Sequence, residues 1–136
     1  MDAIPDSAEL FQPTVADFKR ALLAVRDSNT SDTTWKTWTT LLQAQVQKPE
    51  HKITATGLAE AAKLNGYSEA NLRYGNLAHA VAQQLRYTPP NRPRGDKRPM
   101  WWMTLSTGEV RDDKDQFFEF TMHAALADAL REMRWA

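Results

Sequence analysis

The sequence predicts an α+β fold that is mostly helical, and three observations support this class. Apolar residues recur at three- and four-residue spacing through most of the first 86 residues, which is typical of helices that bury one face. Aromatic and β-branched residues then mark residues 100–107 and 116–122 as strands. A short helix, a tight turn and a longer helix directly precede these strands. Together they predict a winged helix-turn-helix with an N-terminal helical pair, a β-hairpin wing and a C-terminal helix.

We expect one domain preceded by a short acidic arm. The chain has 136 residues, which is close to the size of a single domain, and its first 17 residues carry four acids and no base. The expected parts are an arm over 1–13 and a domain over 14–136, which contains a helix-turn-helix core over about 54–86, a basic loop over 88–99, a hairpin over 100–122 and a closing helix over 123–135.

Two helices are expected before the helix-turn-helix. The first begins near Thr14 and ends in the polar stretch DSNTSDTT. The second runs from about Asp32 to Gln47, and Pro49 stops it. Its tryptophans, Trp35 and Trp38, lie three residues apart, so we expect both in the core.

The helix-turn-helix is predicted over residues 54–64 and 69–86. Thr54 is a suitable N-cap for the short helix and Ser68 for the longer one. Along the longer helix, apolar residues define one buried face that includes Leu77 and Val81. We interpret Gly75 as a packing residue that permits a close contact between helices, at the cost of about 1 kcal/mol of helix propensity.

The hairpin is predicted to pair residues 100–107 antiparallel with 116–122. Side chains alternate between the two faces of a strand, so Trp101 and Leu105 should share one face and Trp102 the other. The matching inner face of the second strand would contain Phe118, Phe120 and Met122.

The chain is neutral overall, but its charge is unevenly distributed. Lys and Arg number 17, as do Asp and Glu, so no net field favours nucleic acid or a membrane. Residues 48–100, however, carry nine bases against four acids, and the basic loop supplies much of this excess. Such a loop either attracts an acidic partner or is charged because loops are solvated.

The segments TATGLAEAAKLNGYSEANLRYGNLAHAVAQQL and FTMHAALADALREMRW, with the tryptophan strand between them, resemble a small domain that accompanies HNH endonucleases of bacterial restriction and phage systems. In that domain a T-x-x-x-L-A-x-A segment precedes N-L-x-Y-G-x-L-A. The resemblance covers about residues 50–135, and the matching positions are Thr54, Leu58, Ala59, Ala61, Asn71, Leu72, Tyr74, Gly75, Leu77 and Trp135. It implies an accessory role around DNA. The chain has no His-Asn-His site, so nuclease activity is not carried over, and Arg134 stands where the pattern has glycine.

The sequence lacks the residue patterns of catalytic, metal and nucleotide sites. It has no cysteine, and His51, His79 and His123 have none of the spacings that bind zinc. The acidic stretch 112–119 lacks the glycine and the final glutamate of an EF-hand loop, which favours a solvated turn. No Gly-rich phosphate loop or nucleophile elbow is present. We therefore expect no metal, no cofactor and no enzymatic activity.

The chain is expected to be soluble and cytoplasmic. No apolar run approaches the ~18 residues of a membrane span. The first residues are acidic, whereas those of a signal peptide would be basic.

Three groups of residues are candidates for nucleic-acid binding. The second helix of a helix-turn-helix presents its N-terminal residues to base edges, where Asn suits adenine and Arg suits guanine. Basic loop residues suit phosphates, and an outward tryptophan suits stacking. The candidates are Ser68, Asn71, Arg73 and Asn76 for base edges, Arg92, Arg94, Lys97 and Arg98 for phosphates, and Trp102 for stacking. The structural alternatives are that the polar helix face only meets water and that Trp102 is core.

Two functions of different classes follow from these residues. The first is a non-catalytic DNA-binding or DNA-associated module whose partner is double-stranded DNA. The second is a small protein-binding inhibitor or adaptor, for example a phage protein that blocks a bacterial defence nuclease. The zero net charge and acidic ends favour the second, because small DNA binders usually carry net positive charge.

Overall fold

The computed structural model describes residues 12–28, 30–92, 98–108 and 118–135. The expected mostly helical α+β class is confirmed. The helices are α2 (Val15–Arg26), α3 (Asp32–Val46), α4 (Ala55–Ala62), α5 (Tyr67–Leu85) and α6 (Ala124–Glu132), the 3-10 helices are η1 (Pro49–His51) and η2 (Trp101–Thr104), and the strands are β1 (Lys52–Thr54), β2 (Ser106–Thr107) and β3 (Glu119–Met122). Among the described residues, none of the helices combines the length and apolar character that a membrane span requires.

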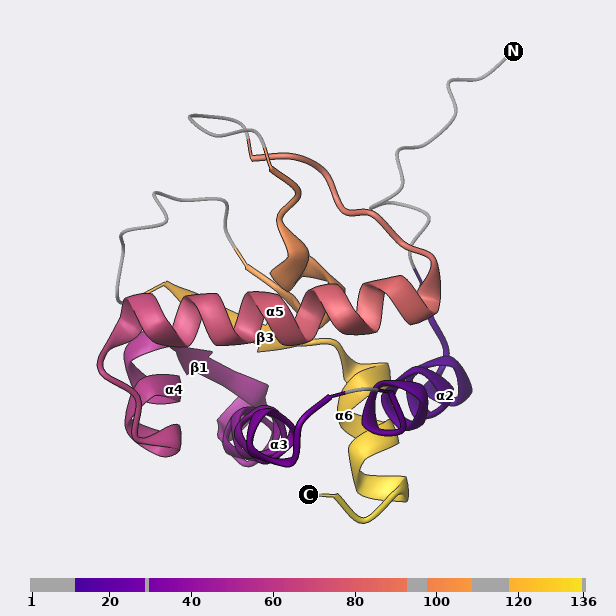
Figure 1. The fold of residues 1–136 in the computed structure, drawn as a ribbon, viewed down its shortest axis with the longest axis horizontal. Coiled ribbons are helices and arrows are strands. Elements are labelled where there is room, and N and C mark those ends of the chain that lie inside the picture. Colours follow the sequence, from indigo (N-terminus) through magenta and orange to yellow (C-terminus); the bar gives the residue numbers. More distant parts are fainter. Residues whose placement is uncertain (1–11, 29, 93–97, 109–117, 136) are drawn as a thin grey trace.

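Helix α5 is the central element of the fold. Figure 1 shows it running across the molecule, with α2, α3, α4 and α6 on one side and the orange segment that carries η2 on the other. Helices α2, α3 and α4 all pack against α5, and α2 also packs against α6. The face of α5 turned to these helices is therefore buried, whereas the side next to η2 meets a shorter segment.

The small sheet is antiparallel and has the strand order β1-β3-β2. Ile53 of β1 lies opposite Phe120 of β3, and Ser106 of β2 lies opposite Met122. The pairing between the predicted hairpin strands is therefore present over β2 and β3. Strand β1 was not expected, because three residues are too few to show an alternating pattern.

The prediction of a strand over the whole of 100–107 is wrong. Residues 101–104 form η2, and only Ser106 and Thr107 pair with β3. Tryptophan favours strands because its ring fits a pleated, half-buried surface. Here the Trp101 ring packs against His79 of α5, and the Trp102 ring packs against Phe120. Tertiary contacts therefore override the local preference, and the expected alternation of faces along 101–105 is lost.

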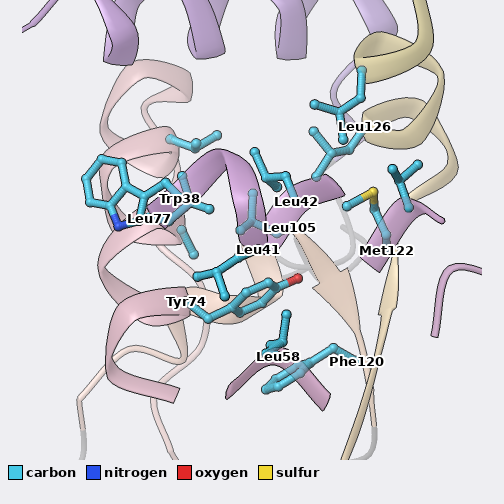
Figure 2. Close-up of a cluster of buried hydrophobic side chains, with 14 of the residues drawn as sticks. Trp38, Leu41, Leu42, Leu58, Tyr74, Leu77, Leu105, Phe120, Met122 and Leu126 are labelled. Atoms are coloured by element: carbon cyan, nitrogen blue, oxygen red, sulfur yellow. The ribbon is translucent and has the colours of Figure 1, made fainter. Parts of the chain in front are cut away.

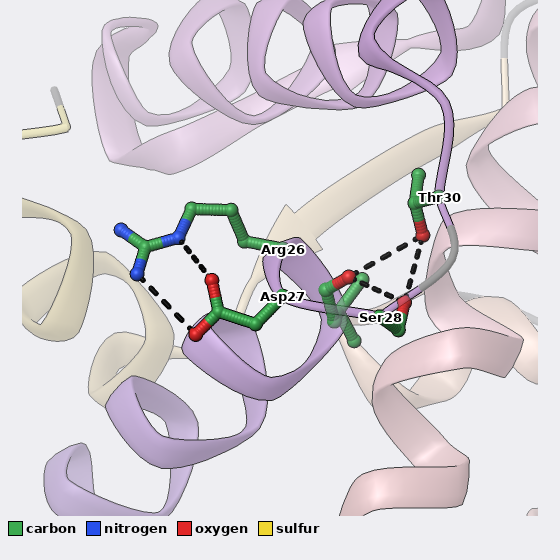
Figure 3. A network of polar contacts seen from close by, with 5 residues as sticks. Arg26, Asp27, Ser28 and Thr30 are labelled. Carbon is green, nitrogen blue, oxygen red and sulfur yellow. Dashed lines mark hydrogen bonds and ion pairs between the residues drawn. The ribbon is translucent and has the colours of Figure 1, made fainter.

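Both ends of α2 are closed by side chains. Thr14 and Asp17 form a capping box at the start of α2, in which each backbone nitrogen lies 2.9 or 3.1 Å from the side-chain oxygen of the other residue. At its other end, the hydroxyls of Ser28 and Thr30 both donate to the carbonyl of Val25 (Figure 3). These contacts stop α2 within the polar stretch where the sequence predicts its end.

Two helices, α4 and α5, lie over the segments predicted as the helix-turn-helix pair, but one predicted cap is wrong. Thr54 caps α4 by accepting a hydrogen bond from the Gly57 N–H at 3.0 Å. The N-cap of α5 is Gly66, not Ser68. The carboxylate of Glu69 accepts a hydrogen bond from the Asn65 N–H at 3.0 Å, so the helix starts before Ser68 and leaves that side chain exposed.

The core lies between α5, the other helices and the sheet (Figure 2). Its labelled members are Trp38, Leu41, Leu42, Leu58, Tyr74, Leu77, Leu105, Phe120, Met122 and Leu126. Trp38 is buried as expected, whereas Trp35 is half-buried and meets Trp135 edge-on, with ring centroids 5.6 Å apart. The expected inner face is buried at Phe120 and Met122 of β3, whereas Phe118 lies just before this strand and is half-buried.

One polar cluster crosses this core. The Tyr74 hydroxyl donates to the Gln45 side-chain oxygen at 2.6 Å and also contacts the Ser106 hydroxyl. The Gln45 amide donates to Ser106 Oγ at 3.0 Å and to the Phe120 carbonyl at 3.1 Å. Burial raises the pKa of Tyr74 above its usual range, so this hydroxyl stays protonated. The cluster joins α3 and α5 to β2 and β3.

The last turn of α6 ends in a left-handed residue. Arg134 has φ 61°, and the Trp135 N–H donates to the Leu130 carbonyl at 2.9 Å. This is the backbone geometry at which helices usually place glycine. Arg134 is also the position at which the resembled pattern has glycine.

Candidate functional site

A groove of about 690 Å³ opens between α5 and η2, and we call it the α5–η2 groove. One wall is the side of α5 from Tyr67 to His79, and the other is made by the end of the basic loop and by η2. Phe118 and Phe120 of the β3 region complete it. Its volume lies within the range of about 300–1,000 Å³ that is usual for small-molecule sites.

The described residues of the helix wall include no Lys, Arg, Asp or Glu. Asn71, Gly75 and His79 recur every four residues, so they lie along one line of α5. Ser68, Leu72 and Asn76 flank this line, and all three are exposed. Leu72 is 61% exposed, although α2, α3, α4 and η2 all pack against the helix that carries it. This wall therefore offers amide and hydroxyl groups beside an open apolar surface.

The opposite wall is aromatic. The Trp101 indole stacks on the His79 imidazole, with centroids 3.9 Å apart and planes 13° from parallel. Trp102 meets the ring of Phe118 edge-on at 5.3 Å and that of Phe120 at 5.7 Å. Trp102 is half-buried, so it is neither a fully outward ring nor a core residue. The 3-10 turn makes this wall possible, because it lets two adjacent tryptophans both contribute to one surface.

Two arginines at the base of the basic loop line the groove. The Arg92 N–H donates to the Arg98 carbonyl at 2.9 Å, and the Met100 N–H donates to the Pro90 carbonyl at 3.0 Å. These backbone bonds hold the two sides of the basic loop together at its base. Both arginine side chains are exposed and line the groove. Arg92 and Arg98 therefore contribute two basic side chains to the lining of the groove.

The groove brings together most of the residues that the sequence predicts for nucleic-acid binding. Those that line it are Ser68, Asn71, Asn76, Arg92, Arg98 and Trp102. Arg94 and Lys97 lie outside the described residues.

Arg73 is the predicted residue that lies elsewhere. It follows Asn71 by two positions, or about 200° around the helix, and so falls on another side of α5. Its guanidinium is 3.8 Å from the Glu69 carboxylate, and its Nε is buried without a hydrogen-bond partner in the described structure. This pairing with Glu69 argues against Arg73 as a reader of base edges.

Several residues of the groove were missed by sequence reasoning. Leu72, His79 and Trp101 were not candidates. For His79 a signal was present, because Asn71, Gly75 and His79 are spaced four residues apart and so share one face of a helix. The interpretation of Gly75 as a close helix contact is wrong. A Cβ built at Gly75 would meet nothing within 4 Å, because the position faces the groove.

The groove offers recognition chemistry and no obvious reactive group. Among the described residues that line it, none is acidic. No group of three or more His, Cys, Asp or Glu side chains in the described part of the chain could hold a metal ion. The lining suits a flat ligand with polar edges and negative charge. Comparisons with protein families, curated proteins and solved structures found no match to this chain.

Proposed function

We propose that this chain is a winged-helix module that binds double-stranded DNA and catalyses no reaction on it. The observation that carries the proposal is that Ser68, Asn71 and Asn76 of α5 line the same groove as Arg92 and Arg98. Polar side chains at the start of a second helix suit base edges, and neighbouring arginines suit phosphates. One bound duplex could therefore contact the polar residues of α5 and the two arginines at the same time.

The order of elements supports the winged-helix assignment. β1 comes directly before α4, and β2 and β3 follow α5. The sheet order β1-β3-β2 places the strand before the helix-turn-helix beside the last strand, as in winged-helix proteins. The turn between α4 and α5 is short and contains Gly66, which is typical of a helix-turn-helix. The resemblance to domains that accompany HNH endonucleases favours a role around DNA as well.

The covering of α5 restricts how DNA can approach. Trp101 stacks over His79, so the second half of the helix is closed on this side. The first two turns, with Ser68, Asn71 and Leu72, remain accessible. We therefore expect the duplex to meet the N-terminal end of α5 and the base of the basic loop, and not the full length of the helix.

Fluorescence anisotropy tests this proposal. Duplexes selected from a random library and duplexes of unrelated sequence would be titrated at several salt concentrations. Replacing both Arg92 and Arg98 by Gln should weaken binding to every duplex and flatten the salt dependence by roughly 0.9 per lost contact. Asn71→Ala should instead cost about 1–3 kcal/mol on the selected sequence and little on others.

The matched control removes the same charge elsewhere. Arg20 and Lys36 lie on α2 and α3, which contribute no described residue to the groove. Their joint replacement by Gln should leave the salt dependence unchanged. Failure of the parent protein to bind any duplex at low salt would refute the proposal.

One observation favours a second function, the binding of a protein partner such as a nuclease. Leu72 is 61% exposed and lies in a groove with an aromatic wall, as an apolar contact for another protein would. A Leu72→Ser variant separates the two functions. It should keep its affinity for duplex DNA if phosphates and base edges dominate, and a protein partner would lose affinity for it.

A further inference from the structure

The α5–η2 groove is a hollow beside the exposed first turns of α5, which we expect to meet the duplex. A helix reads base edges with side chains that project into the major groove, and the stacked bases do not leave the duplex to meet them. The groove, with a volume of about 690 Å³, would therefore stay unfilled by a paired duplex. A ligand that fills it has to project from the nucleic acid into the protein.

The lining matches one class of ligand. The rings of Trp101, Trp102 and Phe118 line the groove on one side, and Asn71 and Asn76 of α5 also line it. Such a site suits a flat heterocycle that is apolar on its faces and carries donors and acceptors on its edge. Arg92, which also lines the groove, suits an attached phosphate. A nucleobase with its sugar phosphate has all of these features.

Gly75 is an independent indication that the groove is kept open. Glycine in the middle of a helix is unfavourable, and here no neighbour demands it, since a Cβ at this position would contact nothing within 4 Å. The position lies in the line Asn71, Gly75, His79 that faces the groove. Any larger side chain there would occupy the space itself. The missing side chain is explained if a ligand uses that space.

We propose that the α5–η2 groove takes one unstacked nucleobase from the bound duplex. This inference rests on the proposed DNA binding and adds to it the part of the DNA that the groove recognises. Swinging a base out of the helix is easiest where the base is mismatched. The protein therefore prefers a duplex with one mismatch over the same duplex fully paired.

The experiment compares the affinities of these two duplexes by anisotropy at one salt concentration. The parent protein should bind the mismatched duplex at least tenfold more tightly. Gly75→Leu fills the groove and should abolish this preference while keeping the affinity for the paired duplex, which depends on phosphate contacts. Gln84→Leu adds the same side chain at an exposed position of α5 outside the groove and should keep the preference.

Folding of the variants is checked by thermal unfolding. Gly75→Ala should melt at a higher temperature than the parent, because alanine favours the helix and finds free space, and it should still weaken the mismatch preference. A variant that gains stability and loses selectivity cannot owe that loss to misfolding.

Each other outcome overturns the proposal in a distinct way. Equal affinity of the parent for both duplexes, or a preference retained by Gly75→Leu, refutes the base pocket and leaves DNA binding intact. Absence of binding to either duplex refutes the proposed function together with this inference. If free deoxynucleoside monophosphates compete at the same concentration as the mismatched duplex, the occupant is a free nucleotide and not a base of DNA.

Discussion

The hydroxyl oxygen of Tyr74 connects α5 to both α3 and the sheet, so its removal tests how much the buried polar cluster stabilises the fold. It donates to Gln45 Oε1 at 2.6 Å and contacts the Ser106 hydroxyl, and all three residues are buried. Tyr74→Phe removes this oxygen and leaves the ring, which stacks on Phe120 with centroids 4.8 Å apart. The substitution therefore tests the polar contacts and not the packing.

The expected loss of stability follows from the contacts. Each hydrogen bond contributes about 0.5–1.5 kcal/mol net, and a buried acceptor left unpaired costs about 1–3 kcal/mol. Tyr74→Phe removes two such contacts and leaves Gln45 Oε1 without a partner in the described structure. We expect the free energy of unfolding to fall by about 2–3 kcal/mol.

Urea unfolding at neutral pH measures this loss, and a double-mutant cycle shows its origin. In a Gln45→Met background no amide oxygen is left unpaired, so Tyr74→Phe should cost at least about 0.5 kcal/mol less there. Tyr67→Phe is the control, since Tyr67 is half-buried on the same helix and its hydroxyl has no hydrogen bond among the described residues. If Tyr74→Phe and Tyr67→Phe both unfold at the parent's urea concentration, the reasoning from the polar cluster is wrong.

Alkaline pH gives a second measurement on the same residue. Burial raises the pKa of Tyr74, whereas an unfolded tyrosine titrates near about 10. The unfolded state therefore loses its proton first, and the stability present below about pH 10 falls as the pH rises above it. This fall should be shallower in Tyr74→Phe, and equal slopes in the two proteins would contradict the assignment.

Three further predictions concern stability. Arg134 has φ 61°, so Arg134→Gly should relieve a left-handed residue and raise the free energy of unfolding by up to about 1 kcal/mol in urea, whereas Arg134→Ala should not. Burial lowers the pKa of His123 below its usual value of about 6.5, so the parent should lose stability as the pH falls through that value, and His123→Gln should lose less over pH 7 to 5. Leu77→Ala, at a fully buried position, should cost about 2–5 kcal/mol in urea, while Leu72→Ala should change stability by less than about 0.5 kcal/mol.

The helices could be predicted from the sequence because their signals are local. Apolar spacing locates a helix wherever one face is buried, and a cap such as Thr54 acts on a backbone N–H only three residues away. The buried positions Leu77 and Val81 follow from the same spacing. Five of the helices in the described structure were expected for this reason. Their ends were less well predicted, because the start of α5 depends on the carboxylate of Glu69 reaching back to Asn65.

The strands and the groove depended on contacts between distant parts of the chain. β1 forms by pairing with β3, in which Ile53 lies opposite Phe120. A segment of three residues carries no pattern from which this partner could be predicted. The tryptophan segment has strand-like composition, yet it forms a 3-10 turn because α5 offers the rings a surface. In the same way, the sequence identified Ser68, Asn71 and Arg92 as binding candidates, but it could not show that they border one hollow. Composition and spacing determine which residues can bind, whereas only the packing of η2 against α5 decides which of them face the same space.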